Sequence, residues 1–205
     1  MNKVLLIGGG GHARSLIEAV GSDIFEGYVA NEPSQLPIPY LGNDATAAEA
    51  YNPNSHSIHL AVGINNGCSL TLRRKILELF SQFGGKTIIA PSAIVTPSST
   101  LGQGCCIMHR AVINRSSLGE HCVVNTGAII EHDCTIGNNV FIAPGAILCG
   151  EVSVGNDVFI GAGAVVRNCA SIASSVSIAM GAVVTSSISE PGIYAGNPAK
   201  LMKRK

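Results

Sequence analysis

The chain has 205 residues, and 13 lysines and arginines balance 13 aspartates and glutamates, so its formal net charge is zero. Charged residues make up 13% of the chain, about half the usual share of ~25%, while apolar residues make up 46%. A disordered chain would be more charged and less apolar, and a nucleic-acid-binding protein would carry a basic excess. So few charges predict an oligomer, because much of the surface would otherwise be poorly solvated.

Strands and helices alternate over the first 86 residues. A buried strand is expected at Val4–Ile7, a helix at Ala13–Val20 and a second strand at Ile24–Val29. A third strand at Ile58–Val62 precedes an amphipathic helix at Leu70–Phe83. This alternation predicts a small parallel α/β domain of the Rossmann-like kind over residues 1–86.

Glycines crowd the turn after the first strand, which reads Gly8-Gly9-Gly10-Gly11-His12. The spacing Gly8-x-Gly10-x-x-Ala13 is similar to a dinucleotide-binding fingerprint, and glycines let backbone N–H groups approach a phosphate at a helix N-terminus. An NAD site also needs an acid near the end of the second strand, where this chain has Val29-Ala30-Asn31. We therefore expect a phosphate-bearing substrate other than NAD. The alternative is a tight glycine turn with no ligand.

A repeat of six residues fills the second half of the chain. Every sixth residue from Leu118 to Val184 is aliphatic, and four positions after each lies a small or β-branched residue. The register extends backwards to Ile89, with one residue missing between Ile113 and Leu118. A period of six fits neither a helix nor an ordinary strand. It predicts short strands separated by tight turns, with both kinds of residue pointing inward.

Three such hexads complete one triangular coil, and coils stack at the strand spacing of ~4.8 Å. Residues 89–188 then give about five and a half coils of a parallel β-helix. We expect this domain over 87–190 and a C-terminal tail over 191–205. The stretch 89–188 holds only eight of the 26 charged residues, so the sides of the prism are expected to pack against neighbouring chains.

The seven cysteines are odd in number and form no C-x-x-C pair, which argues against disulfides and zinc. Cys105, Cys122 and Cys134 fall on small inward positions of the repeat, so we expect reduced, packed thiols. The apolar run near the start of the sequence is too short for the hydrophobic region of a signal sequence. No apolar run of ~18 residues, long enough for a membrane span, occurs elsewhere. The chain is expected to be cytoplasmic, with no membrane or nucleic-acid partner.

One histidine lies at a turn of the repeat, in Ile130-Glu131-His132-Asp133-Cys134. Because Ile130 and Cys134 point inward, the three residues between them project outward. A neutral imidazole is a natural general base, and an adjacent carboxylate can orient it. Gly150 lies one coil above, where its N–H could stabilise a developing oxyanion. Asn114 or Arg115 lies below. The alternative is a solvated turn histidine.

The chain resembles a known family over nearly its whole length: the sialic-acid O-acetyltransferases and UDP-4-amino-sugar N-acetyltransferases, which are left-handed β-helix hexapeptide-repeat enzymes. The left-handed coil and a homotrimer are implied by this resemblance. The matching segments are Gly8–Arg14, Ala61-Val62-Gly63, Val124-Asn125-Thr126-Gly127, Ile130–Cys134 and Gly192–Lys200.

The resemblance also implies roles for individual residues. His132 would be the base and Asp133 would raise its basicity. The nucleotide-sugar site would comprise Gly10, Gly11, His12, Asn31, Gly63 and Asn125. The acetyl-CoA groove between prisms would comprise Gly150, Phe141, Ala162, Met180, Pro198 and Lys200. No metal is expected.

Three positions depart from the family pattern. Ala30-Asn31 replaces the paired acids that are common in members that bind UDP-sugars. Phe141 replaces a polar residue of some members, and Met180 stands where glycine is frequent.

The predicted function is acetyl transfer from acetyl-CoA to an activated sugar, with N-acetylation of a UDP-4-amino-4,6-dideoxy sugar as the first hypothesis. O-acetylation of a sialic acid or another surface-polysaccharide sugar would use the same base. A prism-type carbonic anhydrase would need three histidines on zinc, but His109, His121 and His132 fall on three different sides by hexad counting. A non-enzymatic nucleotide-binding scaffold is a further alternative.

Overall fold

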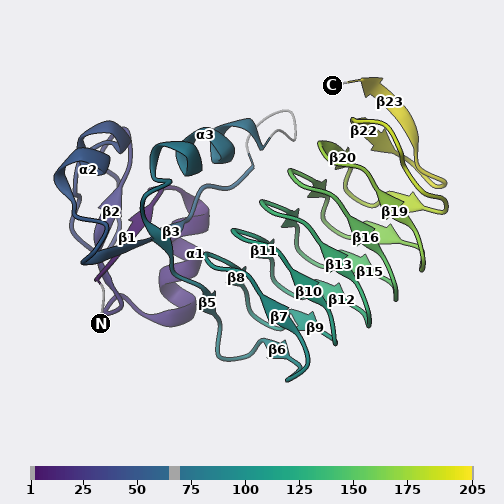
Figure 1. Ribbon diagram of the computed structural model, residues 1–205, viewed down its shortest axis with the longest axis horizontal. Helices are drawn as coiled ribbons and strands as arrows, with labels where there is room; N and C mark the ends of the chain where they lie inside the picture. The colour runs from purple at the N-terminus through teal and green to yellow at the C-terminus, as the bar shows by residue number, and fades with distance from the viewer. Residues whose placement is uncertain (1–2, 65–69, 205) are drawn as a thin grey trace.

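The computed structural model describes residues 3–64 and 70–204. Figure 1 shows an N-terminal α/β domain beside a stack of coils that ends in a C-terminal hairpin. The first helix lies between the N-terminal sheet and the first coils.

The N-terminal domain is built on a four-stranded parallel sheet with the strand order β2-β1-β3-β4. Its elements are β1 (Lys3–Ile7), α1 (Gly11–Val20), β2 (Phe25–Val29), α2 (Asp44–Ala50), β3 (His56–Leu60), α3 (Thr71–Leu79) and β4 (Gly84–Gly85). Alternate side chains of β1 enter different cores. Val4 and Leu6 pack with α1, whereas Leu5 and Ile7 pack with α2 and α3.

These bounds confirm the alternation expected from the sequence and add α2, which the sequence analysis did not predict. This helix is only 7 residues long and buries a single alanine, Ala47. It therefore has almost no apolar periodicity. The Asn43 side chain caps it by accepting a hydrogen bond from the Thr46 N–H at 3.0 Å.

The remaining strands form the three faces of a prism. The first face contains β5 (Ile88–Ile89), β8 (Cys106–Ile107), β11 (Val123–Val124), β14 (Phe141–Ile142), β17 (Phe159–Ile160), β20 (Val176–Ile178), β22 (Gly192–Ala195) and β23 (Lys200–Arg204). The second contains β6 (Ile94–Val95), β9 (Val112–Ile113), β12 (Ile129–Ile130), β15 (Ile147–Leu148), β18 (Val165–Val166) and β21 (Val183–Val184). The third contains β7 (Thr100–Leu101), β10 (Ser117–Leu118), β13 (Thr135–Ile136), β16 (Ser153–Val154) and β19 (Ser171–Ile172).

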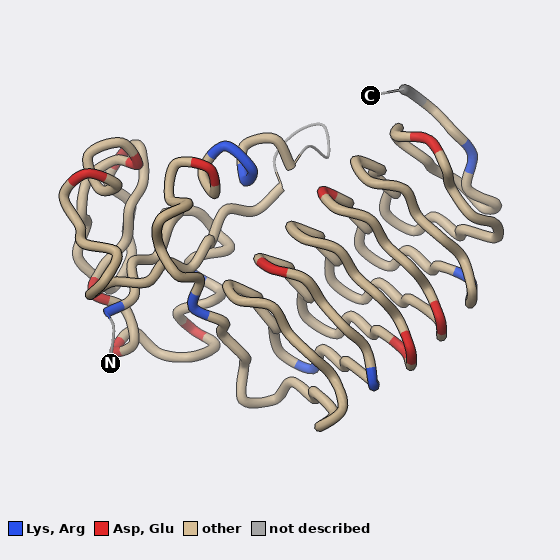
Figure 2. The backbone as a smooth tube through the Cα atoms, in the orientation of Figure 1, with Lys and Arg blue, Asp and Glu red and all other residues tan. Residues whose placement is uncertain are grey.

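The interior of the prism is one continuous apolar core made of the predicted aliphatic and small residues. Cys105, Cys122 and Cys134 lie in this core. All six cysteines in the described part of the chain are free thiols, and Cys68 lies outside the described residues. Charged residues are sparse along the coils (Figure 2). The tail forms an antiparallel hairpin, β22–β23, which extends the first face beyond β20.

The N-terminal domain covers the first face of the prism. Apolar side chains of α1 share a core with Cys106, Val123 and Phe141. The buried Arg73 of α3 also joins the two domains: it donates to the Asn139 side chain at 2.9 Å and to the His121 carbonyl at 2.8 Å. Among the described residues, no helix is long and apolar enough to cross a membrane.

Candidate active site

His132 lies at the turn that joins β12 to β13, on the edge between the second and third faces. Its Nδ1 is 2.9 Å from Asp133 Oδ2, and 53% of its side chain is exposed. When Nδ1 carries the proton and donates to Asp133, Nε2 is left with its lone pair. The ring can then accept a proton at Nε2, as a general base must.

Gly150 lies directly against this ring. A Cβ built on Gly150 would be 2.6 Å from both Cε1 and Nε2 of His132, so only glycine leaves room for the imidazole. The Gly150 carbonyl accepts from the Cys169 N–H at 3.0 Å, and the next N–H, that of Glu151, donates to the His132 carbonyl at 2.8 Å. The Gly150 backbone is therefore fixed beside Nε2, where reacting atoms would pass.

The glycine turn after β1 divides into two parts. Gly8 has φ +128°, and its Cβ would lie 2.7 Å from the Ala61 carbonyl; the Cβ of Gly9 would lie 2.8 Å from Ser34 Oγ. These two glycines are needed by packing. At Gly10 a Cβ would meet nothing within 4 Å, and at Gly11 only the Arg14 guanidinium at 4.0 Å. The bare backbone at the start of α1 thus faces open space, which suits an anionic ligand.

His12 follows these glycines and is held neutral. Burial, and secondarily the nearby Arg73 charge, lower its pKa from 6.5 to about 4. Its ring lies 6.0 Å from that of Phe141, and a Cβ on Gly63 would be 3.8 Å from the His12 Cβ. Nε2 of His12 is buried and has no hydrogen-bond partner among the described residues. A ligand atom that bonded to it would remove the cost of that unpaired group.

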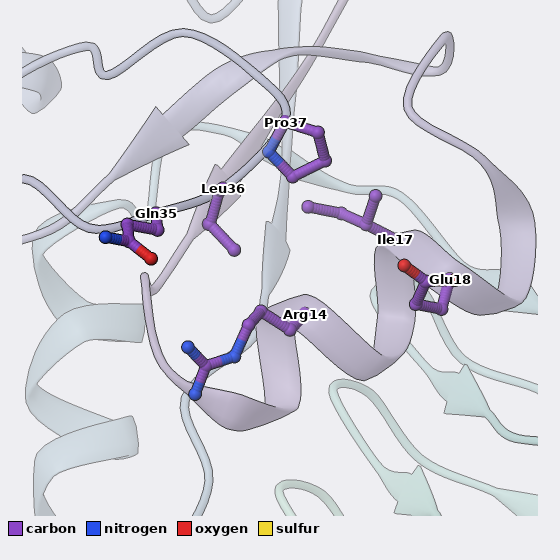
Figure 3. Close-up of a pocket in the computed structure, with 6 residues that line it drawn as sticks. All are labelled: Arg14, Ile17, Glu18, Gln35, Leu36 and Pro37. Atoms are coloured by element: carbon purple, nitrogen blue, oxygen red, sulfur yellow. The ribbon is translucent and has the colours of Figure 1, made fainter.

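A cavity of about 470 Å³ lies beside the same turn, between α1 and the loop after β2. Figure 3 shows the Arg14 guanidinium and the Gln35 amide toward one end, and Ile17, Leu36 and Pro37 lining the rest. Its remaining lining residue is Glu18. Asn31, which the sequence predicts for the nucleotide-sugar site, is exposed just after β2. The cavity residues Gln35–Pro37 were not predicted from the sequence, because they lie in a loop with no periodic pattern.

The other predicted residues fall on two further parts of the prism. Asn125, Ala162 and Met180 lie on the edge between the first and second faces, and Met180 is 80% exposed. Phe141 was expected in the acetyl-CoA groove. In this chain it lies on the first face beneath the N-terminal domain and is 6% exposed. Pro198 and Lys200 belong to the exposed C-terminal hairpin.

The two main groups of predicted site residues are not brought together within one chain. The first group, His132 with Asp133 and Gly150, lies on the edge opposite the first face. The second group surrounds His12 on that first face, and the apolar core of the prism lies between them. A reaction that uses both groups needs two chains.

The histidines also bear on the zinc alternative. His109 lies on the edge between the first and second faces, and its Nδ1 is 2.7 Å from Ser92 Oγ. His121 lies on the edge between the third and first faces, packed against Gly104. Within residues 3–64 and 70–204, no group of three or more His, Cys, Asp or Glu side chains is arranged to hold a metal ion.

Comparisons with known proteins show which family the chain resembles in sequence and fold. Residues 115–150 match the family described as bacterial transferase hexapeptide (six repeats). The acetyltransferase domain of PglB from Neisseria gonorrhoeae superposes with a TM-score of 0.88 and 31% identity, covering 98% of this chain and 100% of that one. Its complex with acetyl coenzyme A gives a TM-score of 0.87 and 30% identity over the same shares.

A second protein is similar to the same degree. PerB from Caulobacter crescentus, in complex with CoA and GDP-perosamine, has a TM-score of 0.87 and 32% identity, covering 98% of this chain and 97% of that one. No curated protein sequence matches the chain. The predicted fold, a Rossmann-like domain followed by a left-handed β-helix of hexapeptide repeats, is confirmed.

Proposed function

Because the chain belongs to the hexapeptide-repeat sugar acetyltransferases with a Rossmann-like N-terminal domain, we propose that it transfers the acetyl group of acetyl-CoA to the amino group of a nucleotide-linked sugar. The observation that carries this proposal is the His132 ring, which Asp133 orients at 2.9 Å and which lies against Gly150. This is a base beside a backbone donor, as acyl transfer requires.

In the proposed reaction the sugar amine attacks the thioester carbonyl carbon while Nε2 of His132 takes one of its protons. The carbonyl oxygen becomes an oxyanion near the Gly150 N–H. When the tetrahedral intermediate collapses, the C–S bond breaks and the CoA thiolate leaves, to be protonated by the imidazolium. Asp133 stabilises that imidazolium through Nδ1. The products are the N-acetylated sugar nucleotide and free CoA.

The N-terminal domain is proposed to hold the acceptor. The phosphates of the sugar nucleotide would lie at the bare backbone of Gly10 and Gly11, and its nucleobase would enter the cavity beside Arg14. The sugar would extend toward His12 and Gly63. Both the neutral, unpaired Nε2 of His12 and the open space at Gly10 support this arrangement.

The nucleotide is proposed to be a nucleoside diphosphate, with GDP tested beside UDP. UDP was the first expectation from the sequence. However, Ala30-Asn31 carries no acid at the end of β2, and the similar PerB was solved with GDP-perosamine. The cavity offers both a guanidinium and an amide, from Arg14 and Gln35, to the edge of a base.

A homotrimer is proposed because it unites the two groups of site residues. The edge of one prism that carries His132 would face the neighbour's first face and the edge that carries Asn125, Ala162 and Met180. Acetyl-CoA would lie in the groove between the prisms, near the exposed Met180 and the C-terminal hairpin with Pro198 and Lys200. The charge-poor faces of the prism suit such burial.

The test is a panel of UDP- and GDP-linked amino sugars, together with free sialic acid, incubated with acetyl-CoA. The readouts are release of free thiol and the mass of the product. We expect acetylation of a nucleotide-linked amino sugar and loss of that activity in His132→Ala, which retains its oligomeric state. Undiminished turnover by His132→Ala would remove His132 from the mechanism. If sialic acid were the one substrate acetylated, the proposed N-acetylation would be wrong and the reaction would be O-acetylation.

A further inference from the structure

The turn beneath His132 is one residue shorter than the other turns of the repeat. Ile113 and Leu118 are five positions apart instead of six. The register changes at the same place: Val112 pairs with Ile129, an offset of 17 residues, whereas Ser117 pairs with Thr135, an offset of 18. Three turn residues, 114–116, therefore lie beneath the four turn residues 131–134.

In this short turn Arg115 is the counterpart of Asp133. Both residues have the left-handed backbone of the turn, with φ 43° and φ 61°. The Asp133 N–H donates to the Arg115 carbonyl at 3.0 Å. The Arg115 side chain rises along the edge, and its Nε lies 3.1 Å from Asp133 Oδ1. Since the short turn pairs Arg115 with Asp133, no separate residue is left to lie beneath His132.

The short turn is fixed from inside the prism. Ser116 is buried, at 3% exposed. Its hydroxyl lies 2.7 Å from the Glu131 carbonyl and accepts from the Cys134 N–H at 2.9 Å. The Arg115 N–H donates to Thr96 Oγ1 at 2.7 Å in the coil below. These bonds hold the Arg115 backbone in place relative to the turn that carries His132.

Asp133 thus has one partner on each carboxylate oxygen. Oδ1 forms an ion pair with Arg115 Nε at 3.1 Å, and Oδ2 is left to hold Nδ1 of His132 at 2.9 Å. The other charged residues of the turns 114–116, 131–134 and 149–152 are acidic: Glu131, which accepts from Asn114 at 3.2 Å, and Glu151, one coil above Asp133. Arg115 is therefore the cation that this turn places among three carboxylates.

We infer that Arg115 is a positioning residue for the acetyl transfer: by binding Oδ1 of Asp133, it turns Oδ2 toward His132 and so keeps the imidazole in the tautomer that exposes a basic Nε2. This inference rests on the proposed function of His132 as the base. Arg115 makes its side-chain contact at the surface, with 69% of the side chain exposed, so the pair adds little to folding stability.

The test compares Arg115→Gln and Arg115→Lys with the wild-type protein in the full chain. In Arg115→Gln we expect kcat to fall about fivefold, the upper end of what an exposed ion pair contributes, with unchanged KM values for acetyl-CoA and acceptor. Arg115→Lys should recover most of kcat because it keeps the cation. Arg74→Gln is the matched control, since it breaks another exposed arginine–aspartate ion pair, with Asp157 at 3.4 Å, on another edge of the prism.

A second readout does not depend on activity. Ring ¹⁵N chemical shifts of His132, assigned by comparison with His132→Gln, report which nitrogen carries the proton. The Nδ1–H tautomer should dominate in the wild type and decline in Arg115→Gln. An unchanged tautomer, an unchanged kcat, or a raised KM for acetyl-CoA alone would overturn the inference. If the wild type acetylated no member of the panel, the proposed function would fail while the ¹⁵N shifts still decided the role of Arg115.

Discussion

Most turn residues of the β-helix lie above a counterpart in the coil below, with the short turn beneath His132 as an exception. The proposed binding residues of the N-terminal domain instead come from separate elements brought together by folding. His132, Gly150 and Asp133 belong to two stacked turns of one edge. His12, Gly63 and the cavity of Figure 3 are assembled from α1 and the loops after β2 and β3. In the proposed function, the β-helix would therefore hold the base on a rigid scaffold, and the N-terminal domain would supply the acceptor site. Substitutions in one region should change kcat, and substitutions in the other should change acceptor KM.

The largest effect on stability is expected where the two regions join. Arg73→Met removes three hydrogen bonds, to the buried Asn139 side chain and to the carbonyls of the half-buried Val62 and His121. We expect the free energy of unfolding to fall by about 3–5 kcal/mol, measured by denaturant titration. Arg74→Met is the control, because the adjacent Arg74 makes exposed ion pairs, with Asp157 at 3.4 Å and Glu78 at 4.0 Å, and should cost at most about 1 kcal/mol. Equal losses in both variants would contradict a buried clamp.

Acid should destabilise the N-terminal domain through its buried histidines. Burial lowers the pKa of His59 to about 3 and that of His12 to about 4, whereas both would titrate near 6.5 in the unfolded chain. The unfolded state then binds more protons below that pH, so stability is complete above ~6.5 and is lost as pH falls toward the folded values. By pH 5 the loss should be about 2 kcal/mol for each histidine.

The variant His59→Leu should remove about half of this pH dependence. The substitution also removes the hydrogen bond between the His59 ring and the Lys86 carbonyl at 2.8 Å, which changes the absolute stability of the variant. The quantity to compare is therefore the slope of unfolding free energy against pH. A wild-type slope in His59→Leu would show that His59 does not titrate with unfolding.

Within the β-helix, Gly150→Ala should act on chemistry alone. The added Cβ would approach Nε2 of His132 to 2.6 Å, so the exposed ring must turn away from the reacting atoms. We expect kcat to fall about 100-fold, the usual contribution of a positioned base, with little change in melting temperature. Gly84→Ala, where a Cβ meets nothing within 4 Å, controls for a generic glycine effect. Wild-type kcat in Gly150→Ala would mean that this ring position is not the reactive one.

In the N-terminal domain the smallest expected effect is that of Gly10→Ala. Because a Cβ there meets no protein atom within 4 Å, the variant should fold normally and raise acceptor KM about tenfold by crowding the phosphates. The acetyl-CoA KM should stay unchanged. Gly8→Ala is the contrasting variant: with φ +128° and the Ala61 carbonyl at 2.7 Å, it should lose stability instead. An unaltered acceptor KM in Gly10→Ala would place the phosphates elsewhere.

The β-helix was more predictable from the sequence than the acceptor site, for physical reasons. A hexad repeats one environment many times, so the inward positions and the turn at His132 follow from counting. The irregular parts do not repeat. The helix Asp44–Ala50 buries one side chain, the cavity residues Gln35–Pro37 lie in a loop, and the burial of Phe141 depends on how the N-terminal domain docks. The sequence shows that the repeat is one residue short before Leu118. That this shorter turn brings Arg115 against Asp133 was found only in the structure.

The most direct test asks whether the two regions of neighbouring chains form one site. His132→Ala removes the base, and Gly10→Asp places a negative charge at the phosphate position while keeping a good helix N-cap. Each variant alone should be inactive. Mixed trimers of the two, co-expressed with different tags and purified through both, should recover about one third of wild-type activity, because one of three interfaces would hold both intact groups. Mixed trimers as inactive as the pure variants would contradict a site shared between chains.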